Sequence, residues 1–380
     1  MIMIGGSLPA QQMGPANVLS RLFTSGAEAV QYTDQFKNAL PAPQLQQVLD
    51  QISGQLGEFQ EVRGESNPYT VVFSGGTATA LVQLDNQARL AGLRFTAIAP
   101  AAGSLDEAVA RFRELPGEVA FLITRNGEGV AAQQADAALA VGSSFKLAVL
   151  AAVQEAVAAG EMSWDQVVRV RDDWRSLPTG LVQDWPAGSA VTVETLATLM
   201  ISQSDNTATD ALIRLVGRRA VEAFAPSSRP LLTTREAFIL KDPDNARLKE
   251  DFLAAPEDEA REILDEIDVD ELPEAGLFTG DPVSPEVEWF FSAAELCGMM
   301  EQVAELDLTT VNPGVANAGN WRRVSYKGGS EPGILNMTTR LLAADGTVYC
   351  VSVTQNRNDS ALDETAFFAA YQGVLGALGQ

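Results

Sequence analysis

The chain has 380 residues, 46% of them hydrophobic, and its 50 acidic against 26 basic residues give a formal net charge of −24. This length allows two domains with a large buried core. The acidic balance argues against nucleic acid and anionic membrane surfaces as partners, because both repel a negative protein. No apolar run reaches the length of a membrane span.

The first residues, Met1 to Gly6, are too short for the apolar core of a signal peptide and include no basic residue. Two cellular locations follow: a cytoplasmic protein, or a periplasmic or secreted protein whose leader has been removed, which we favour. Residues 1–17 are rich in Gly, Pro and Gln, and we expect them to form a loose arm.

Residues 18–98 change from a helical to a strand-like pattern. Apolar side chains recur at helical spacing from Val18 to Leu56, with a break at residues 41–43. Three strand-like segments follow, over 69–73, 77–84 and 90–95. We therefore expect an α+β domain over 18–98, with helices followed by a small antiparallel sheet, and a flexible linker over 97–104.

A second domain is expected over residues 104–380. A helix that Ser104 can cap and a hairpin over 119–134 begin it, and a helix from Ser143 to about Gly160 follows. Strands over 323–326, 333–343 and 347–355 and a helix over 360–378 end it. Because strands stand at both ends with helices between them, the first and last strands are expected to share one sheet.

The stretch 242–288 is unusually acidic, with 17 acidic residues against three basic ones. Charge runs are usually solvated faces, and the spacing of an EF-hand loop is absent. We therefore expect an exposed excursion with one or two short helices rather than a metal site.

The two cysteines, Cys297 and Cys350, are too few for a disulfide framework. Cys350 lies in an apolar strand-like segment and Cys297 in a helical one. Free cysteine is often buried, so two buried thiols are expected, with a single bridge between them as the alternative.

Three short motifs carry the chemistry: Ser143-Ser144-Phe145-Lys146, Ser204-Asp205-Asn206 and Lys327-Gly328-Gly329. The chain contains no His, the residue that most often activates a serine nucleophile. It contains only five lysines, and two of them fall in these motifs. A lysine is therefore the expected base.

Ser143 and Lys146 are three residues apart, which places them on one helix face. Burial and the neighbouring charge of Lys327 should lower the pKa of Lys146 toward neutrality, so that its amine can take the proton of the serine. The N–H of Ser143 at the helix start could stabilise an oxyanion. The structural alternative is a helix cap with a surface lysine.

The second and third motifs fit the same chemistry. Ser204 could pass a proton to the leaving group with Lys327 beside it, while Asn206 bonds the substrate or Lys146 and Asp205 fixes the loop. The glycines after Lys327 could let a substrate lie along the strand, with the N–H of Ser330 as a second oxyanion donor. The structural alternatives are a capping turn and a β-bulge.

These motifs resemble those of the class A β-lactamases and penicillin-binding proteins, whose patterns are Ser-x-x-Lys, Ser-Asp-Asn and Lys-Thr/Ser-Gly. The resemblance covers about residues 104–380 and implies a class A β-lactamase-like α/β domain, an antiparallel sheet flanked by helices. It implies that Ser143 is the acylated nucleophile and Lys146 a base. It also implies that Ser204 is a proton relay and Lys327 an electrostatic anchor. It implies substrate contacts for Asn206, Tyr326, Gly329 and Ser330.

The front part resembles the cystatin/NTF2-like (steroid-isomerase-like) domains that precede some β-lactamase-like proteins. The whole layout is similar to the two-domain β-lactamase-like proteins of clavulanic acid biosynthesis, as are the segments 231–236 and 326–333. For this domain a structural or docking role is expected ahead of an isomerase role, which rests on fold analogy.

The chain departs from the class A pattern in two places. No Glu-x-x-Leu-Asn stands between Asn206 and Lys327, and Glu236 is the nearest candidate for the missing base; its alternative is a helix-start Glu paired with Arg235. Gly328 replaces the hydroxyl residue of the third motif, which Ser330 or Arg340 could compensate. Both departures argue against efficient penicillin hydrolysis.

We therefore expect a serine hydrolase that forms an acyl-enzyme, either an esterase or a weak β-lactam hydrolase, acting on a small ester or β-lactam-like substrate. It should need no cofactor and no metal. The alternatives are a D,D-carboxypeptidase or transpeptidase acting on peptidoglycan, and an acylatable β-lactam sensor without turnover.

Overall fold

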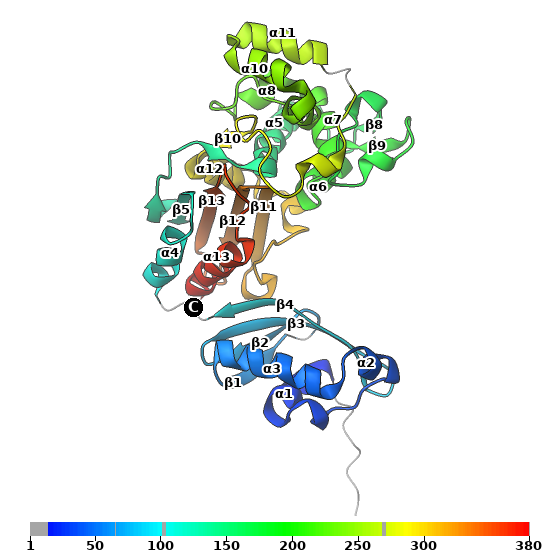
Figure 1. Ribbon diagram of the computed structural model, residues 1–380, viewed down its shortest axis with the longest axis vertical. Helices are drawn as coiled ribbons and strands as arrows, with labels where there is room; N and C mark the ends of the chain where they lie inside the picture. The colour runs from blue at the N-terminus through cyan, green and yellow to red at the C-terminus, as the bar shows by residue number, and fades with distance from the viewer. Residues whose placement is uncertain (1–13, 65, 101–103, 268–270, 380) are drawn as a thin grey trace, which may run out of the picture. The chain divides into compact units, whose positions relative to one another are not determined.

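The computed structural model describes residues 14–64, 66–100, 104–267 and 271–379. The chain divides into two compact units, one made of Met1–Arg111 with Phe368–Gln380 and the other of Phe112–Phe367. Figure 1 shows the first three helices of the first unit in blue and its last helix, at the end of the chain, in red; the colours between cyan and red mark the second unit. Within the described residues, no helix is both long and apolar enough to cross a membrane.

The front part contains helices followed by a four-stranded antiparallel sheet in the order β1-β2-β3-β4. Its elements are α1 (Pro15–Ser25), α2 (Asp34–Ala39), α3 (Ala42–Leu56), β1 (Phe59–Arg63), β2 (Tyr69–Phe73), β3 (Gly76–Leu84), β4 (Leu90–Pro100) and α4 (Leu105–Arg113). Buried leucines of α1 and α3, such as Leu19 and Leu49, share one core with Phe73 of β2. This is the helix-then-sheet arrangement that the sequence predicts, while the resemblance to cystatin/NTF2-like domains remains a prediction.

Two expectations for the front part need correction. Residues 15–17 are not part of a loose arm, because α1 begins at Pro15, a favoured first helical residue. Residues 1–13 lie outside the described residues. Residues 97–100 are not linker but the end of β4, where Ile98 pairs with Ala78 of β3. Residues 101–103 of the expected linker also lie outside the described residues.

The second unit is built on a five-stranded antiparallel sheet in the order β11-β12-β13-β5-β6. These strands are β5 (Glu118–Arg125), β6 (Glu128–Gln133), β11 (Arg323–Glu331), β12 (Ile334–Leu342) and β13 (Val348–Asn356). The last strand pairs with the first, with Val353 opposite Phe121, which confirms the prediction that the two ends share a sheet. Two-residue strands β7 (Leu139–Ala140) and β10 (Phe290–Phe291) pair separately, as do β8 (Val167–Arg169) and β9 (Ala190–Thr192).

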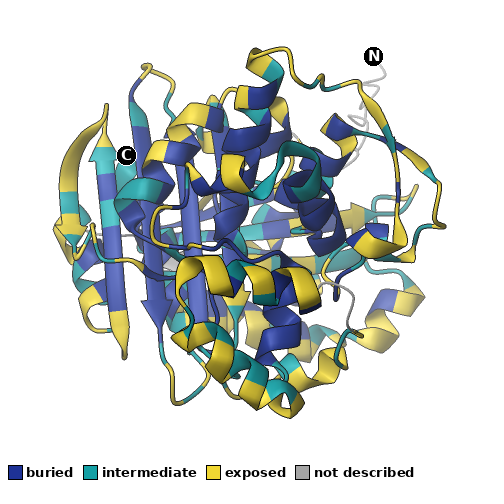
Figure 2. Ribbon diagram, turned by 90° about the horizontal axis from the view of Figure 1, so that it is seen from above, coloured by how far each residue is buried: buried dark blue, intermediate teal, exposed yellow. Residues whose placement is uncertain are grey.

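A buried helix, α5 (Lys146–Ala158), is the centre of the second unit's helical part. Around it lie α6 (Val193–Ser202), α7 (Asn206–Val216), α8 (Arg218–Glu222) and α12 (Ala293–Val303). Further helices of this unit are α9 (Thr234–Lys241), α10 (Ala246–Ala254) and α11 (Glu257–Ile267), while α13 (Glu364–Leu378) falls mostly in the first unit. Residues 147–153 are all buried, so α5 is apolar on every side. Figure 2 shows the sheet strands and the inner helices in the dark blue of buried residues.

The acidic stretch forms short helices, as predicted, but it is not wholly exposed. One face of α11 buries Ala260, Leu264 and Ile267. From the same helix Arg261 makes ion pairs with Glu222 of α8 and Glu257. Apolar spacing within the charge run therefore fixes α11 to the core. Residues 268–270 lie outside the described residues.

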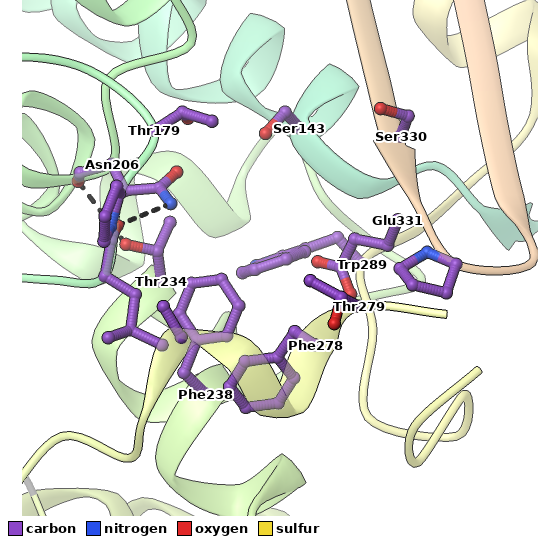
Figure 3. Close-up of a pocket in the computed structure, with 14 residues that line it drawn as sticks. Ser143, Thr179, Asn206, Thr234, Phe238, Phe278, Thr279, Trp289, Ser330 and Glu331 are labelled. Atoms are coloured by element: carbon purple, nitrogen blue, oxygen red, sulfur yellow. Dashed lines mark hydrogen bonds between the residues drawn. The ribbon is translucent and has the colours of Figure 1, made fainter. Parts of the chain in front are cut away.

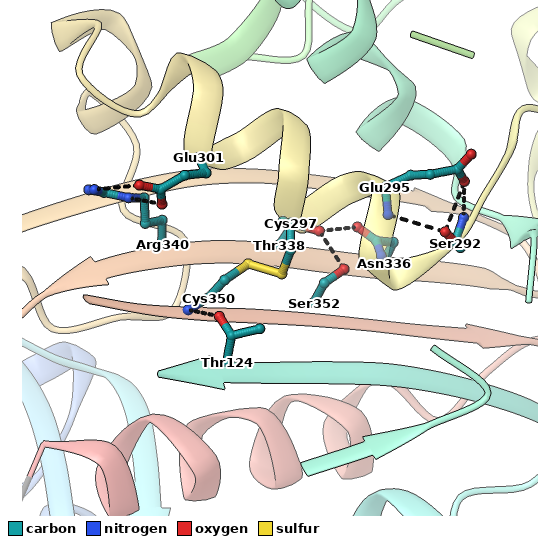
Figure 4. The surroundings of a disulfide bond; sticks show 10 residues. All are labelled: Thr124, Ser292, Glu295, Cys297, Glu301, Asn336, Thr338, Arg340, Cys350 and Ser352. Atoms are coloured by element: carbon teal, nitrogen blue, oxygen red, sulfur yellow. Dashed lines mark hydrogen bonds and ion pairs between the residues drawn. A yellow bond between two sulfur atoms is a disulfide. The ribbon is translucent and has the colours of Figure 1, made fainter. Parts of the chain in front are cut away.

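The expectation of two free thiols is wrong, because Cys297 and Cys350 form a disulfide (Figure 4). Packing of α12 on β13 brings the two Cα atoms to 5.9 Å, inside the range that a disulfide spans. Sequence spacing gave no sign of this approach, since 53 residues separate the two positions.

Replacing both cysteines by alanine should lower the free energy of unfolding by about 2–4 kcal/mol, because the bridge limits the freedom of the unfolded chain. Denaturant unfolding of the wild type and of the Cys297→Ala/Cys350→Ala variant measures this. A reductant should destabilise the wild type and leave the double variant unchanged; equal stability of the two proteins would contradict the prediction.

Candidate active site

Ser143 stands on a tight turn in front of the central helix. Residues Gly142–Phe145 form a 3₁₀ turn, and α5 begins only at Lys146, slightly later than predicted. The turn packs against the core, because the Phe145 ring stacks on Trp289 with 4.1 Å between ring centroids. The backbone N–H of Val141 also donates to the carbonyl of Trp289 at 3.0 Å. These contacts hold Ser143 in one position.

Gly329 lets β11 lie against this turn. A Cβ atom at Gly329 would stand 2.2 Å from the Val141 carbonyl oxygen and 2.5 Å from the Ser143 nitrogen, distances that no side chain tolerates. From the turn's side, Gly142 has a φ of +49° and faces the backbone of Gly329 and Ser330. The glycines after Lys327 were expected to make room for a substrate, but at Gly329 the close neighbour is the turn that carries Ser143.

The hydroxyl of Ser204 lies between two lysine side chains. Lys146 Nζ donates to Ser204 Oγ at 3.2 Å, and Lys327 Nζ donates to the same oxygen at 3.2 Å. Lys146 also donates to the Ser204 carbonyl and to Asn206 Oδ1, both at 2.6 Å. Three motifs from distant parts of the chain therefore meet in one hydrogen-bonded group.

Both lysines are driven toward the neutral amine. Lys146 is 0% exposed, and burial lowers its pKa to about 7, although the carboxylates of Asp210 and Asp205 oppose this shift. Burial also lowers the pKa of Lys327 well below its usual value, and the charge of Lys146 adds to the effect. A neutral amine next to a serine hydroxyl can accept a proton.

The Ser204-Asp205-Asn206 turn is held by the middle residue. Asp205 caps α7 by accepting from Ala208 N at 2.8 Å, and its other oxygen accepts from the N–H groups of Leu181 and Val182. Ser204 itself has a φ of +59°, which is rare outside glycine. Asn206 holds the neighbouring loop by donating to the Leu177 carbonyl at 3.0 Å. The turn therefore caps α7 and also supplies the hydrogen-bond acceptors for the two lysines.

A cavity of about 270 Å³ lies in front of Ser143 (Figure 3). Of the predicted site residues, Ser143, Asn206 and Ser330 line it. Lys146 and Lys327 are buried outside its lining, and Tyr326 and Gly329 do not line it either. The other lining residues are Leu177, Pro178, Thr179, Thr234, Phe238, Ala275, Phe278, Thr279, Trp289, Glu331 and Pro332.

Tyr326 explains the glycine that replaces the motif's hydroxyl residue. A Cβ atom at Gly328 would stand 2.1 Å from the phenol oxygen of Tyr326, so the phenol fills the space of a side chain at that position. Burial raises the pKa of Tyr326 to about 12, so it stays protonated. A hydroxyl is therefore present beside Gly328, but it comes from a residue two positions earlier.

Two candidates from the sequence occupy other places. Glu236 forms a capping box with Thr233 at the start of α9, as the helix-start alternative predicts, and an ion pair with Arg218. It does not line the cavity. Arg340 points to α12, where it hydrogen-bonds Glu301 at 2.5 Å, so it does not replace the missing hydroxyl (Figure 4).

Sequence reasoning missed most of the cavity wall. Trp289, Phe238 and Phe278 come from segments without a motif, and only their large apolar side chains distinguish them. It also missed Asp210, a buried residue of α7 whose carboxylate accepts from the Thr234 hydroxyl at 2.9 Å. Burial raises the pKa of Asp210 to about 7. The sequence offered one sign of this residue: Asp210 follows Asn206 by four positions, one helical turn, which places the two side chains on the same face of α7.

The sequence and the fold both match known proteins. Residues 102–261 match the model of the Beta-lactamase enzyme family. A beta-lactamase from Sphaerobacter thermophilus has a similar structure, with a TM-score of 0.51 and 22% identity over 72% of this chain and 95% of that chain. A mutant of the class A beta-lactamase of the last common ancestor of Gram-negative bacteria gives a TM-score of 0.50 and 17% identity over 73% and 99% of the two chains. No curated protein sequence matches the chain.

At these identities the two structures establish the fold, which is class A β-lactamase-like over about 72% of the chain. The matched family segment contains Ser143, Lys146, Ser204 and Asn206. The chain therefore combines a class A β-lactamase-like fold with a segment that matches the Beta-lactamase enzyme family. Lys327 lies beyond the matched segment and joins the group through the sheet.

The rate at which Ser143 is acylated should rise with pH around a midpoint near the pKa of Lys146, about 7. Below that pH Lys146 is an ammonium group and cannot accept a proton; above it the neutral amine can. Phosphonylation of Ser143 by an uncharged fluorophosphonate, which needs the same nucleophile and base, measures the profile between about pH 5 and about pH 9. A pH-independent rate, or an unchanged profile in Lys146→Met, would contradict the assignment.

Gly329→Ala should slow acylation at least about 100-fold, because the new Cβ atom displaces the backbone of the nucleophile turn. Gly298→Ala is the matched control, since no described atom lies within 4 Å of a Cβ at that helical position. Acylation rates and thermal unfolding of both variants measure the effect. Equal rates for the two variants would mean that the turn tolerates displacement.

Proposed function

We propose that this protein is a serine hydrolase that forms an acyl-enzyme at Ser143 and acts on esters in preference to β-lactams. The observation that carries the proposal is the Ser204 hydroxyl between Lys146 and Lys327, two buried amines with lowered pKa values, beside a cavity that Ser143 lines. Purely structural lysines would be paired with carboxylates, as Lys241 is with Glu288.

In the proposed acylation, Ser143 Oγ attacks the ester carbonyl carbon while the neutral amine of Lys146 takes its proton. The N–H groups of Ser143 and Ser330 stabilise the oxyanion. When the ester C–O bond breaks, the proton passes from Lys146 through the Ser204 hydroxyl to the leaving alkoxide. Lys146 is then neutral again and can take a proton from the water that hydrolyses the acyl-enzyme.

The preference for esters rests on what surrounds Ser143. Glu236, the candidate for a deacylating base, is held by Arg218 and Thr233 outside the cavity. Water activation is then left to Lys146, which suits ester-derived acyl-enzymes because their leaving alcohol has departed and does not block the water. A β-lactam-derived acyl-enzyme keeps its amine attached and should persist longer.

The front part is proposed to be an accessory domain. Its helix-then-sheet order supports the resemblance to cystatin/NTF2-like domains and to the two-domain β-lactamase-like proteins of clavulanic acid biosynthesis. Domain limits of 18–98 and 104–380 stay a prediction.

We expect intact-mass spectrometry to reveal a single adduct on the wild type after treatment with a fluorophosphonate, and none on Ser143→Ala. With a 4-nitrophenyl ester the wild type should turn over steadily, because the ester acyl-enzyme hydrolyses. With a cephalosporin an adduct should form slowly and persist. Thermal unfolding of Ser143→Ala verifies that the variant is folded.

The alternatives predict other outcomes of the same experiment. A β-lactam sensor would be acylated by the cephalosporin and would turn over neither the cephalosporin nor the 4-nitrophenyl ester. A D,D-peptidase would release D-alanine from a peptide ending in D-Ala-D-Ala. Adduct formation that persists in Ser143→Ala, or no adduct with any probe, would overturn the proposed mechanism.

A further inference from the structure

One charged side chain, Glu331, lines the cavity. It ends β11, directly after Ser330, and its side chain is 19% exposed (Figure 3). None of the described residues that line the cavity is Lys or Arg. Lys327, which lies on the same strand as Glu331, is 2% exposed and has a lowered pKa. The described lining residues therefore offer a substrate one negatively charged side chain and no positively charged one.

Glu331 is fixed in this position by a buried cluster. Lys241 of α9 makes ion pairs with both Glu331 and Glu288, and Lys241 and Glu288 are buried away from the cavity. Burial raises the pKa of Glu288 to about 8, with the charge of Glu331 adding to the effect. Whether Glu288 is protonated or not, the cluster has a net charge of zero or −1. Its negative end is the one that faces the cavity.

About half of the other lining residues are apolar, and these include three aromatic side chains. Phe238 and Phe278 are in ring contact at 5.0 Å between centroids, and Trp289 and Leu177 add to the same lining. Such a surface favours aromatic or aliphatic groups over polar ones. An anion brought here would lose water and gain a like charge as neighbour, and no described lining residue carries a positive charge to offset that repulsion.

We propose that Glu331 makes this site selective for uncharged or cationic esters with an apolar acyl group and excludes anionic substrates. The proposal rests on the proposed function and names its substrate class. It predicts poor use of penicillins and of peptides ending in D-alanine, because both carry a carboxylate close to the bond that is cleaved.

The test uses three 4-nitrophenyl esters of similar length: the butyrate, the anionic glutarate monoester and the cationic 4-(trimethylammonio)butyrate. Acylation is measured from the release of 4-nitrophenol and confirmed by intact mass. The wild type should react with the anionic ester at least about tenfold more slowly than with the butyrate, from like-charge repulsion in the cavity. The cationic ester should react at least as fast as the butyrate.

Glu331→Gln should bring the anionic and neutral rates to within about threefold, because the repelling charge is gone. The variant keeps Lys241 and Glu288 as a balanced pair, and thermal unfolding verifies that it folds. Glu288→Gln is the matched control, because it makes the same change in the same cluster at a residue that does not line the cavity. It should leave the ratio of the neutral to the anionic ester rate at the wild-type value.

The outcomes separate the two proposals. If the wild type reacts equally with the neutral and anionic esters, or if Glu331→Gln leaves the ratio unchanged, charge selection is overturned and the acyl-enzyme stands. If no ester acylates Ser143, the proposed function fails, and the substrate class fails with it. A ratio that collapses equally in Glu288→Gln would assign selectivity to the cluster as a whole and overturn the specific role of Glu331.

Discussion

The candidate site depends on the burial of two amines around one serine hydroxyl. Lys146 and Lys327 come from the central helix and from the sheet, and both reach Ser204 Oγ at 3.2 Å. Keeping two lysines out of water is costly unless they give up their protons, and the lowered pKa values are the consequence. In the proposed mechanism, the same burial that destabilises the charged forms would provide the base in a chain without histidine.

The fold holds that group together by close backbone approach. Gly329 on β11 lies against the turn that carries Ser143, and Gly180 leaves room for the carboxylate of Asp205. The stacking of Phe145 on Trp289 fixes the turn from the other side. These contacts come from different segments of the chain. A small displacement of any one segment would therefore move Ser143 or Ser204 relative to the lysines. The disulfide between α12 and β13 adds a covalent tie to the same sheet.

The cavity and the lysine group have different chemical characters. The lysines form a polar, buried layer behind Ser143, while aromatic side chains and Glu331 form the wall that a substrate meets. Under the proposed function, the buried lysines and the side chains of the cavity wall would have different roles, proton transfer for the lysines and substrate choice for the wall. Such a division would let a β-lactamase-like fold keep its acyl-transfer group while the wall selects a different class of substrate.

The sequence by itself determined the chemistry-bearing motifs, the α+β order of the front part and the sheet shared by the chain's two ends, because these follow from residue type, spacing and local period. It did not determine the disulfide, the Arg218 partner of Glu236, the place of Tyr326 beside Gly328 or the aromatic wall. Those features depend on contacts between segments that are far apart in the chain, and no local sequence pattern predicts such contacts. Tertiary structure alone decided them, since burial and distance between remote residues are properties of the packed fold.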